Sequence, residues 1–320
     1  MGTLALHPSL LCWVHSLNPV TMQKIIPHLW FDTQAEEAAN FYISLFNDSK
    51  ITDVAHYPDA GKEITGKDAG SVMTVAFEIS GYSIIALNGG PHFNINPSIS
   101  FMVNCESKEE VDRLWGGLSN GGTALMPLDA YPFSERYGWI QDRFGMSWQI
   151  SYSPAASQKI IPALMFVGDN CGKAEEAISL YTSIVDDAKV GTLVKYPAGV
   201  EYGKEGTIMF ADFILSSQSF AAMDSAGPHQ FNFNEGVSLL VNCENQEEID
   251  RYWSALSAYP ESEQCGWLKD RYGLSWQISP KGMDYFFKSN DREAVNRAMA
   301  AMLSMKKIDI AAMEAAARGA

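Results

Sequence analysis

The chain contains two copies of one unit, and this duplication constrains the fold more than any other feature. The run KIIPHLWF at 24–31 returns as KIIPALMF at 159–166. The run GWIQDRFGMSWQIS at 138–151 returns as GWLKDRYGLSWQIS at 266–279, with ten of fourteen positions identical. Self-similarity at this period indicates that one domain has been copied in tandem.

The spacing between the copies defines the boundaries of the units. It is 135 residues at the start of the unit and 128 at its end, after a deletion of ten residues from the second copy. The joint SYSPAASQ, at 151–158, is short and rich in small residues, as a linker should be. We therefore predict an N-terminal extension at 1–22, domain 1 at 23–152, domain 2 at 159–280 and a helical tail at 281–320.

Each unit is itself divided into two similar parts, here called modules. A module is predicted to contain a strand, a helix and three further strands, because apolar residues alternate in the strand runs and recur at helical spacing between them. Thr33 with Glu36 predicts a capping box at the first helix, and Ser107 with Glu110 predicts one at the second. The pattern predicts an α+β protein built from βαβββ modules.

Several phrases of the chain resemble one known family. FYISLF, GGPHF, VNCESKEEVDRLW and GWIQDRFGMSWQI are together similar to the PhnB-like branch of the vicinal oxygen chelate (VOC) superfamily, labelled 3-demethylubiquinone-9 3-methyltransferase-like. The resemblance covers about residues 23–280. It implies tandem glyoxalase-like domains, each of paired βαβββ modules whose curved sheets surround a cavity, with the helices outside. It also implies that the two units pack as an intramolecular pseudo-dimer.

The same resemblance implies candidate metal ligands. Members of the superfamily commonly hold a divalent metal through His, Gln or Glu side chains on the first and last strands of the modules. The matching positions are His28 and Gln149, and the metal would be Zn, Ni, Mn or Fe. Gln149 carries no charge and binds a cation less strongly than Glu would. The alternative is that both side chains line the cavity and orient a ligand by hydrogen bonds.

Further polar and aromatic positions are candidates for ligand binding. Strand alternation places His28 and Trp30 on one face. In the second unit Ala163 replaces His28, so we expect any metal site to be confined to the first unit. The ligand-binding candidates are Trp30, Asn88, Trp139, Gln149, His229 and Gln277.

The segment GGPHFNINPSIS, at 89–100, returns as AGPHQFNFNEGVS at 226–238. Its glycines and proline predict a turn at the crossing between two modules. His92 either braces this crossing or, with His28, is a catalytic candidate that acts as a general base at the cavity mouth. Asp142 and Asp270, before the last strands, are expected to be either solvated or turn-bracing.

Composition excludes several classes of function. The net charge of −15 and the lack of a basic stripe argue against nucleic-acid binding. Five cysteines without C-x-x-C spacing indicate a reducing cytoplasm, and no apolar run is long enough to span a membrane. Because no glycine-rich nucleotide loop occurs, we expect no nucleotide cofactor and disfavour S-adenosylmethionine-dependent methyl transfer.

The two ends of the chain lie outside the repeat. Met22 precedes the first ordered pattern, so residues 1–21 are either absent from the native protein, a loose extension or, less favoured, a secretory signal. In the tail, 292–305 and 308–320 read as helices, with Asp309 as an N-cap. Their methionines pack either on the second unit or against another copy in a homodimer.

Two functions follow from these features. The first is a glyoxalase-like, metal-assisted lyase, isomerase or dioxygenase-type step on a small oxygenated substrate, with the metal as a Lewis acid. The second is a non-catalytic protein that binds a small ligand, as a resistance protein does.

Overall fold

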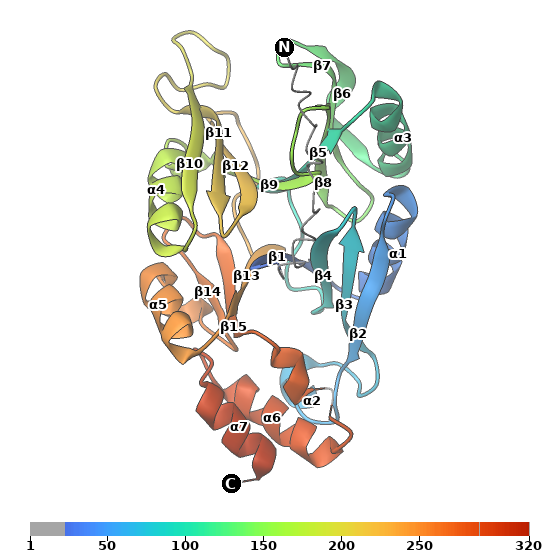
Figure 1. Cartoon of the computed structure of the whole chain (residues 1–320), viewed down its shortest axis with the longest axis vertical. Coiled ribbons are helices and arrows are strands. Elements are labelled where there is room, and N and C mark those ends of the chain that lie inside the picture. Colours follow the sequence, from blue (N-terminus) through green and yellow to red (C-terminus); the bar gives the residue numbers. More distant parts are fainter. Residues whose placement is uncertain (1–22, 288, 320) are drawn as a thin grey trace, which may run out of the picture.

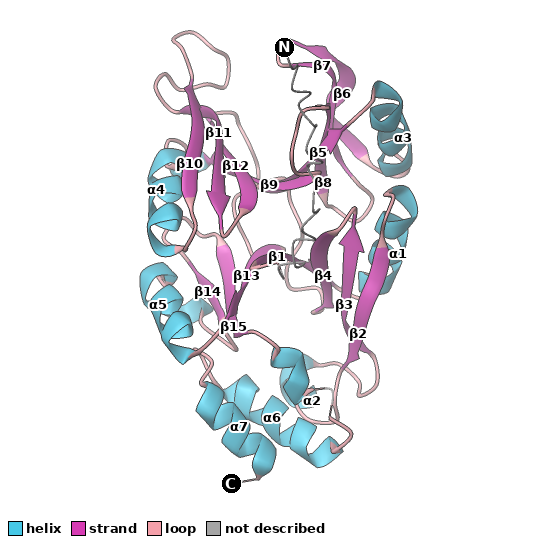
Figure 2. Cartoon of the chain, viewed as in Figure 1, coloured by secondary structure: helices cyan, strands magenta, loops and turns pink. Residues whose placement is uncertain are grey.

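The computed structural model describes residues 23–287 and 289–319, and the predicted N-terminal extension at 1–22 lies outside them. Two curved sheets form the interior, and helices cover their outer faces (Figures 1 and 2). This arrangement confirms the predicted α+β fold of tandem βαβββ modules. None of the helices in the described residues is long and apolar enough to cross a membrane.

Sheet A has seven strands, in the order β14-β15-β13-β1-β4-β3-β2. Its strands are β1 (Ile25–Phe31), β2 (Lys50–His56), β3 (Val72–Ile79), β4 (Tyr82–Asn88), β13 (Val237–Cys243), β14 (Trp267–Lys269) and β15 (Ser275–Pro280).

Sheet B has eight strands, in the order β10-β11-β12-β9-β5-β8-β7-β6. Its strands are β5 (Ile99–Cys105), β6 (Thr123–Tyr131), β7 (Ser134–Gln141), β8 (Ser147–Tyr152), β9 (Ile160–Val167), β10 (Lys189–Lys195), β11 (Ile208–Leu215) and β12 (Gln218–Ser225).

Each module contains one long helix and the tail contains two, as the sequence pattern predicts, while the four-residue α2 was not predicted. They are α1 (Ala35–Leu45), α2 (Lys62–Thr65), α3 (Lys108–Leu118), α4 (Ala174–Ile184), α5 (Gln246–Leu256), α6 (Arg292–Ser304) and α7 (Ile310–Arg318), with 3₁₀ turns at Gly168–Asn170, Pro260–Ser262 and Met283–Phe286.

Each sheet combines one module from each unit. β1 of the first unit pairs antiparallel with β13 of the second, and β5 pairs antiparallel with β9. Sheet A therefore joins the first module of unit 1 to the second module of unit 2, and sheet B joins the other two modules. The two units form an intramolecular pseudo-dimer whose strands pair across the unit boundary.

The two crossing segments hold one another at the centre of the molecule. The Nδ2 of Asn96 donates to the carbonyl of Asn232 at 3.0 Å, and the Nδ2 of Asn234 donates to the carbonyl of Asn94 at 2.9 Å. Gly236 is required here, because a Cβ at this position would lie 2.4 Å from the Asn94 carbonyl oxygen. The two asparagine-rich segments thus make the same type of contact, in which an asparagine side chain of each donates to a backbone carbonyl of the other.

The apolar core lies between the sheets and the helices. On α1, Ala38 and Tyr42 are fully buried against Val75 and Phe77 of β3. Because successive strand residues face opposite sides, the alternate positions turn away from the helices. We call this helix-free side of each sheet its inner face.

The helix starts test the predicted caps. Ser107 accepts the backbone N–H of Glu110 at 3.1 Å, and Asp309 accepts that of Ala312 at 2.9 Å, which confirms both as N-caps. The predicted capping box at Thr33 is wrong, because α1 begins at Ala35 after Gln34.

The last module lacks its outer strand, and the tail takes that place. The deletion leaves only a 3₁₀ turn, Pro260–Ser262, where unit 1 has β6. Near β14, the N–H groups of Cys265 and Gly266 donate to the carbonyls of Met305 and Lys306 at 2.8 and 2.7 Å. The tail thus satisfies an edge that the deletion would expose.

Asp270 is a buried brace for the last turn. It is 0% exposed, so the expectation of a solvated group is wrong and the turn-bracing alternative is confirmed. Its Oδ1 accepts the backbone N–H groups of Tyr272 and Leu274, and its Oδ2 accepts the hydroxyl of Tyr181 and the Nε1–H of Trp276. Asp142 makes the matching backbone and tryptophan bonds in unit 1.

We predict that Asp270→Ala lowers the free energy of unfolding by about 3 kcal/mol or more, because four buried donors lose their acceptor. Urea denaturation followed by circular dichroism measures the change. Asp142→Ala should cost a similar amount, while the exposed Asp169→Ala should cost little. A loss under about 1 kcal/mol for Asp270→Ala would contradict the role as a brace.

Candidate functional site

Five polar and aromatic side chains gather on the inner face of sheet A. His28 lies opposite Ser238 across the β1–β13 pair, and Ser238 lies opposite Ser275 on β15. Gln277, two residues further along β15, lies opposite Trp267 on β14. His28 comes from unit 1 and the other four from unit 2, so the cluster exists only because the units exchange modules.

Sheet B carries the matching cluster at the equivalent register positions. Ser100 lies opposite both Ala163 and Ser147, and Trp139 lies opposite Gln149. Four of the five positions hold the same residue type as in sheet A. The exception is Ala163, which stands where sheet A has His28. The molecule therefore contains its own comparison between two inner faces.

On sheet B the polar groups satisfy one another. The hydroxyl of Tyr137 donates to the Oε1 of Gln149 at 2.9 Å, and the Nε2 of Gln149 donates to the Oγ of Ser100 at 2.7 Å. The Nε1–H of Trp139 donates to the Oγ of Ser147 at 2.5 Å. Buried polar groups that are fully paired in this way stabilise a fixed arrangement.

On sheet A the same network is incomplete. The Nε2 of Gln277 still donates to the Oγ of Ser238, at 2.9 Å. Cys265 stands at the repeat position of Tyr137, so no phenol reaches the Oε1 of Gln277. The Oγ of Ser275 is buried and has no hydrogen-bond partner among the described residues, because the Nε1–H of Trp267 does not donate to it.

Trp267 packs instead against His28. Their ring centroids are 5.9 Å apart and the ring planes are nearly perpendicular, at 89°. His28 is 5% exposed, and its Nδ1 is buried without a hydrogen-bond partner in the described part of the chain. Burial lowers the pKa of His28 from 6.5 to about 3, so the imidazole is neutral at neutral pH.

Trp30 extends the aromatic wall beside this cluster. Its ring centroid lies 5.8 Å from that of Trp267 and 5.0 Å from that of Phe93, both nearly edge-on. Its Nε1–H donates to the carbonyl of Gly90 at 2.8 Å, which ties the tryptophan to the crossing turn. His92 is exposed, and its ring centroid lies 6.5 Å from that of Trp30.

Asn88 is not brought to the inner face. Its Oδ1 accepts the N–H of Ala35 at 2.9 Å, and its Nδ2 donates to the carbonyl of Val72 at 3.1 Å. It therefore supplies the cap that α1 otherwise lacks. Asp224 has the same role in unit 2, where it accepts the N–H groups of Gly172 and Ala174 at the start of α4.

His229 is held within the second crossing turn. Its Nε2 lies 2.7 Å from the Oγ of Ser225, and its ring lies 5.0 Å from that of Phe231. Burial lowers its pKa below the ordinary value. The structure thus separates His229 from the sheet A cluster, as it does Trp139 and Gln149.

The residues present do not fit a divalent metal centre. His28 and Gln149, the two predicted ligands, lie on different sheets, and the glutamine on the sheet of His28 is Gln277. Within residues 23–287 and 289–319, no group of three or more His, Cys, Asp or Glu side chains is placed to hold a metal ion. One imidazole with an amide and two hydroxyls is a weak donor set for a transition metal.

Ser238, Ser275 and Trp267 were missed by reasoning from the sequence. The alternation of SWQIS places Ser275 on the same face as Gln277, which is a signal that could have identified it. The approach of His28 to Ser238 and Trp267 has no local signal, because it depends on pairing between strands about 210 residues apart.

Comparison with known proteins identifies the family. The family model described as 3-demethylubiquinone-9 3-methyltransferase matches residues 23–151 and again 158–279, more than three quarters of the chain. A comparison with curated proteins finds no match.

Several solved structures are similar. The Bacillus cereus PhnB protein is 37% identical over 41% of this chain and 100% of its own, with a TM-score of 0.38. A Staphylococcus aureus protein is 33% identical over 41% of this chain and 96% of its own, with a TM-score of 0.17. Glyoxalase I from Zea mays is 11% identical over 80% of this chain and 93% of its own, with a TM-score of 0.50, which is a likeness of fold. The chain therefore belongs to the 3-demethylubiquinone-9 3-methyltransferase family and has a glyoxalase-like fold.

Proposed function

We propose that the protein binds a small, uncharged, oxygen-bearing molecule on the inner face of sheet A. The observation that carries this proposal is that two buried atoms on this face, the Nδ1 of His28 and the Oγ of Ser275, have no hydrogen-bond partner among the described residues. A buried polar atom without a hydrogen bond costs about 1–3 kcal/mol, and a ligand that supplies the bond removes that cost. Sheet B, on an equivalent backbone, leaves no such atoms at the matching positions.

The chemistry of the cluster favours a neutral ligand. His28 is uncharged, Gln277 and Ser275 are amide and hydroxyl groups, and Lys269, a cation on the same face, is paired with Glu235 at 2.8 Å. Trp30 and Trp267 present aromatic surface, against which a planar ring can pack edge-on or in an offset stack. A molecule with one carbonyl and one hydroxyl group suits these contacts.

Binding is favoured over catalysis. An imidazole with a pKa of about 3 is a poor general base near neutral pH, where an efficient base has a pKa close to the pH of the reaction. No metal-assisted step is proposed, because the donor set does not fit a metal. The family description names a methyltransferase, but the sequence has no glycine-rich cofactor loop, so methyl transfer is the less favoured alternative.

We predict that 4-hydroxyacetophenone, an uncharged ring with a carbonyl and a hydroxyl group, binds saturably and changes the tryptophan fluorescence. His28→Ala and Ser275→Ala should each weaken binding about five- to tenfold, the value of one hydrogen bond. Ser147→Ala, the matched change on sheet B, should leave the affinity unchanged. Equal effects of Ser275→Ala and Ser147→Ala, or no saturable binding, would count against the proposal.

A second prediction concerns the free protein. Ser275→Ala removes a hydroxyl that has no partner, so we expect the free energy of unfolding to stay constant or to rise slightly. Ser147→Ala should lower it by about 1 kcal/mol, because Trp139 loses its acceptor. Urea titration of the two variants measures this difference. The interpretation fails if Ser275→Ala proves as destabilising as Ser147→Ala.

A third prediction uses the pKa of His28. The folded-state pKa of about 3 lies below the ordinary 6.5, so between these values the unfolded chain takes up a proton that the folded chain does not. The free energy of unfolding should therefore fall as the pH drops through this window, by about 1.4 kcal/mol per pH unit from His28. Above the window the contribution of His28 should be constant.

His28→Ala introduces the residue found at the matching position 163, and it should remove the pH dependence of stability that His28 causes. Between pH 6 and pH 4 the wild type should lose about 2–3 kcal/mol more than the variant. The exposed His56→Ala serves as control and should follow the wild type. Parallel curves for the wild type and His28→Ala would show that His28 is not buried in its neutral form.

A further inference from the structure

The tail makes a second junction with unit 1. Besides its bonds near β14, α6 contacts the hairpin that follows β2, where the N–H of Ala60 donates to the Oδ1 of Asn296 at 3.1 Å. Gly61 lies so close to α6 that a Cβ there would be 2.4 Å from the Cδ1 of Leu303. The tail therefore spans from one edge of sheet A to the other (Figure 1).

A cleft of 420 Å³ lies at this junction. We call it the tail cleft; its two walls are formed by residues 56–59 and 69–70 of unit 1 and by positions 287, 289, 292 and 295–296 of the tail. Its volume is within the range of small-molecule sites. The structure forms it only when residues more than 200 positions apart are docked together.

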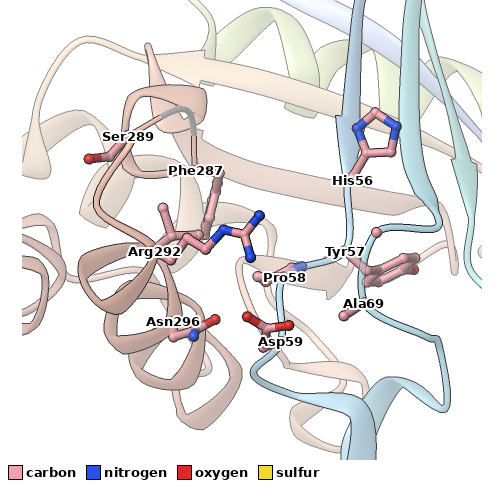
Figure 3. A pocket seen from close by; sticks show the side chains of 11 residues that line it. His56, Tyr57, Pro58, Asp59, Ala69, Phe287, Ser289, Arg292 and Asn296 are labelled. Atoms are coloured by element: carbon pink, nitrogen blue, oxygen red, sulfur yellow. The ribbon is translucent and has the colours of Figure 1, made fainter.

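Two opposite charges face one another across the tail cleft. Figure 3 shows the guanidinium of Arg292 extending from α6 and the carboxylate of Asp59 extending from the hairpin toward the same space. In the described part of the chain, neither side chain forms an ion pair or a hydrogen bond, with the other or with a third residue. The nearby acids are engaged elsewhere, since Asp291 caps α6 and Glu293 pairs with Arg297.

Apolar side chains also line the tail cleft, beside the polar Ser289 and Asn296 of the tail. On the tail side Val295 is buried and Phe287 is half-buried. On the other wall Pro58 adds a further apolar surface. The tail cleft thus offers a cationic group, an anionic group and apolar surface, and none of its lining residues belongs to the cluster on sheet A.

We propose that the tail cleft binds a small zwitterion with an apolar side chain, such as an α-amino acid. Its carboxylate accepts hydrogen bonds from the guanidinium of Arg292, which suits a planar two-oxygen group. Its ammonium group donates to the carboxylate of Asp59, and its side chain packs against Phe287 and Val295. Because the ligand contacts both walls, it links the tail to unit 1.

The probe for this site is L-phenylalanine, titrated into the full chain by isothermal calorimetry. Both charged groups are exposed, so we expect weak binding, with a Kd on the order of 0.1–1 mM. The Kd should rise about fivefold or more for 3-phenylpropionate, which lacks the ammonium group, and for 2-phenylethylamine, which lacks the carboxylate.

Variants locate the binding. Arg292→Gln and Asp59→Asn should each raise the Kd about fivefold or more, while Arg292→Lys should retain part of the affinity. Arg271→Gln changes another exposed arginine that has no ion pair with the described residues; it is the matched control and should have no effect. His28→Ala should also have none, which separates this site from the inner face of sheet A.

Hydrogen exchange gives an independent readout. Phenylalanine should slow amide exchange in residues 56–60 and 289–296, because the ligand links these segments. The proposal is overturned if no saturable binding occurs up to about 10 mM, if Arg292→Gln and Arg271→Gln behave alike, or if 3-phenylpropionate binds as tightly as phenylalanine.

Discussion

The pairing of first strands across the two units is the contact on which the rest of the molecule depends. β1 pairs with β13 and β5 with β9, so neither unit completes a sheet by itself. Gln218 reinforces the join between the sheets, since its side-chain amide bonds to both the N–H and the carbonyl of Ile25. Loss of the pairing between β1 and β13 and between β5 and β9 would expose four strand edges, and it would separate His28 from the other residues of the candidate site.

The sequence predicted the elements well because their signals are local. The cap at Ser107, the cap at Asp309 and the order of strands and helices follow from residue type and spacing over a few positions. The cap of α1 was not predictable in this way, because its acceptor, Asn88, lies 53 positions from Ala35.

His28 illustrates the same limit for the site: the periodicity of β1 gives the face on which it lies, but not the strand beside it. Gln149 and Gln277 occupy the same repeat position, and only the exchange of modules decides which of them joins His28.

The two inner faces show how few changes separate a closed polar network from an open one. Tyr137 completes the bonds of Gln149, and its replacement by Cys265 leaves the matching atom of Gln277 without a phenol. Sheet A has His28 where sheet B has the smaller Ala163. Trp267 packs against His28 and does not donate a hydrogen bond to Ser275. The tail adds to this asymmetry, because its contacts with the hairpin after β2 and with the segment before β14 are both at the edges of sheet A.

Sheet B shows why the unpaired atoms of sheet A matter. A single buried donor or acceptor without a partner is uncommon and costly, and taken alone it could reflect a constraint of the backbone. Here the same backbone, in sheet B, carries a serine and a glutamine at matching positions with their bonds made. The cost on sheet A therefore comes from the choice of side chains and not from the fold. The unpaired polar atoms are held in place by the rigid sheet. A ligand that forms hydrogen bonds with them therefore causes little loss of conformational entropy in the protein.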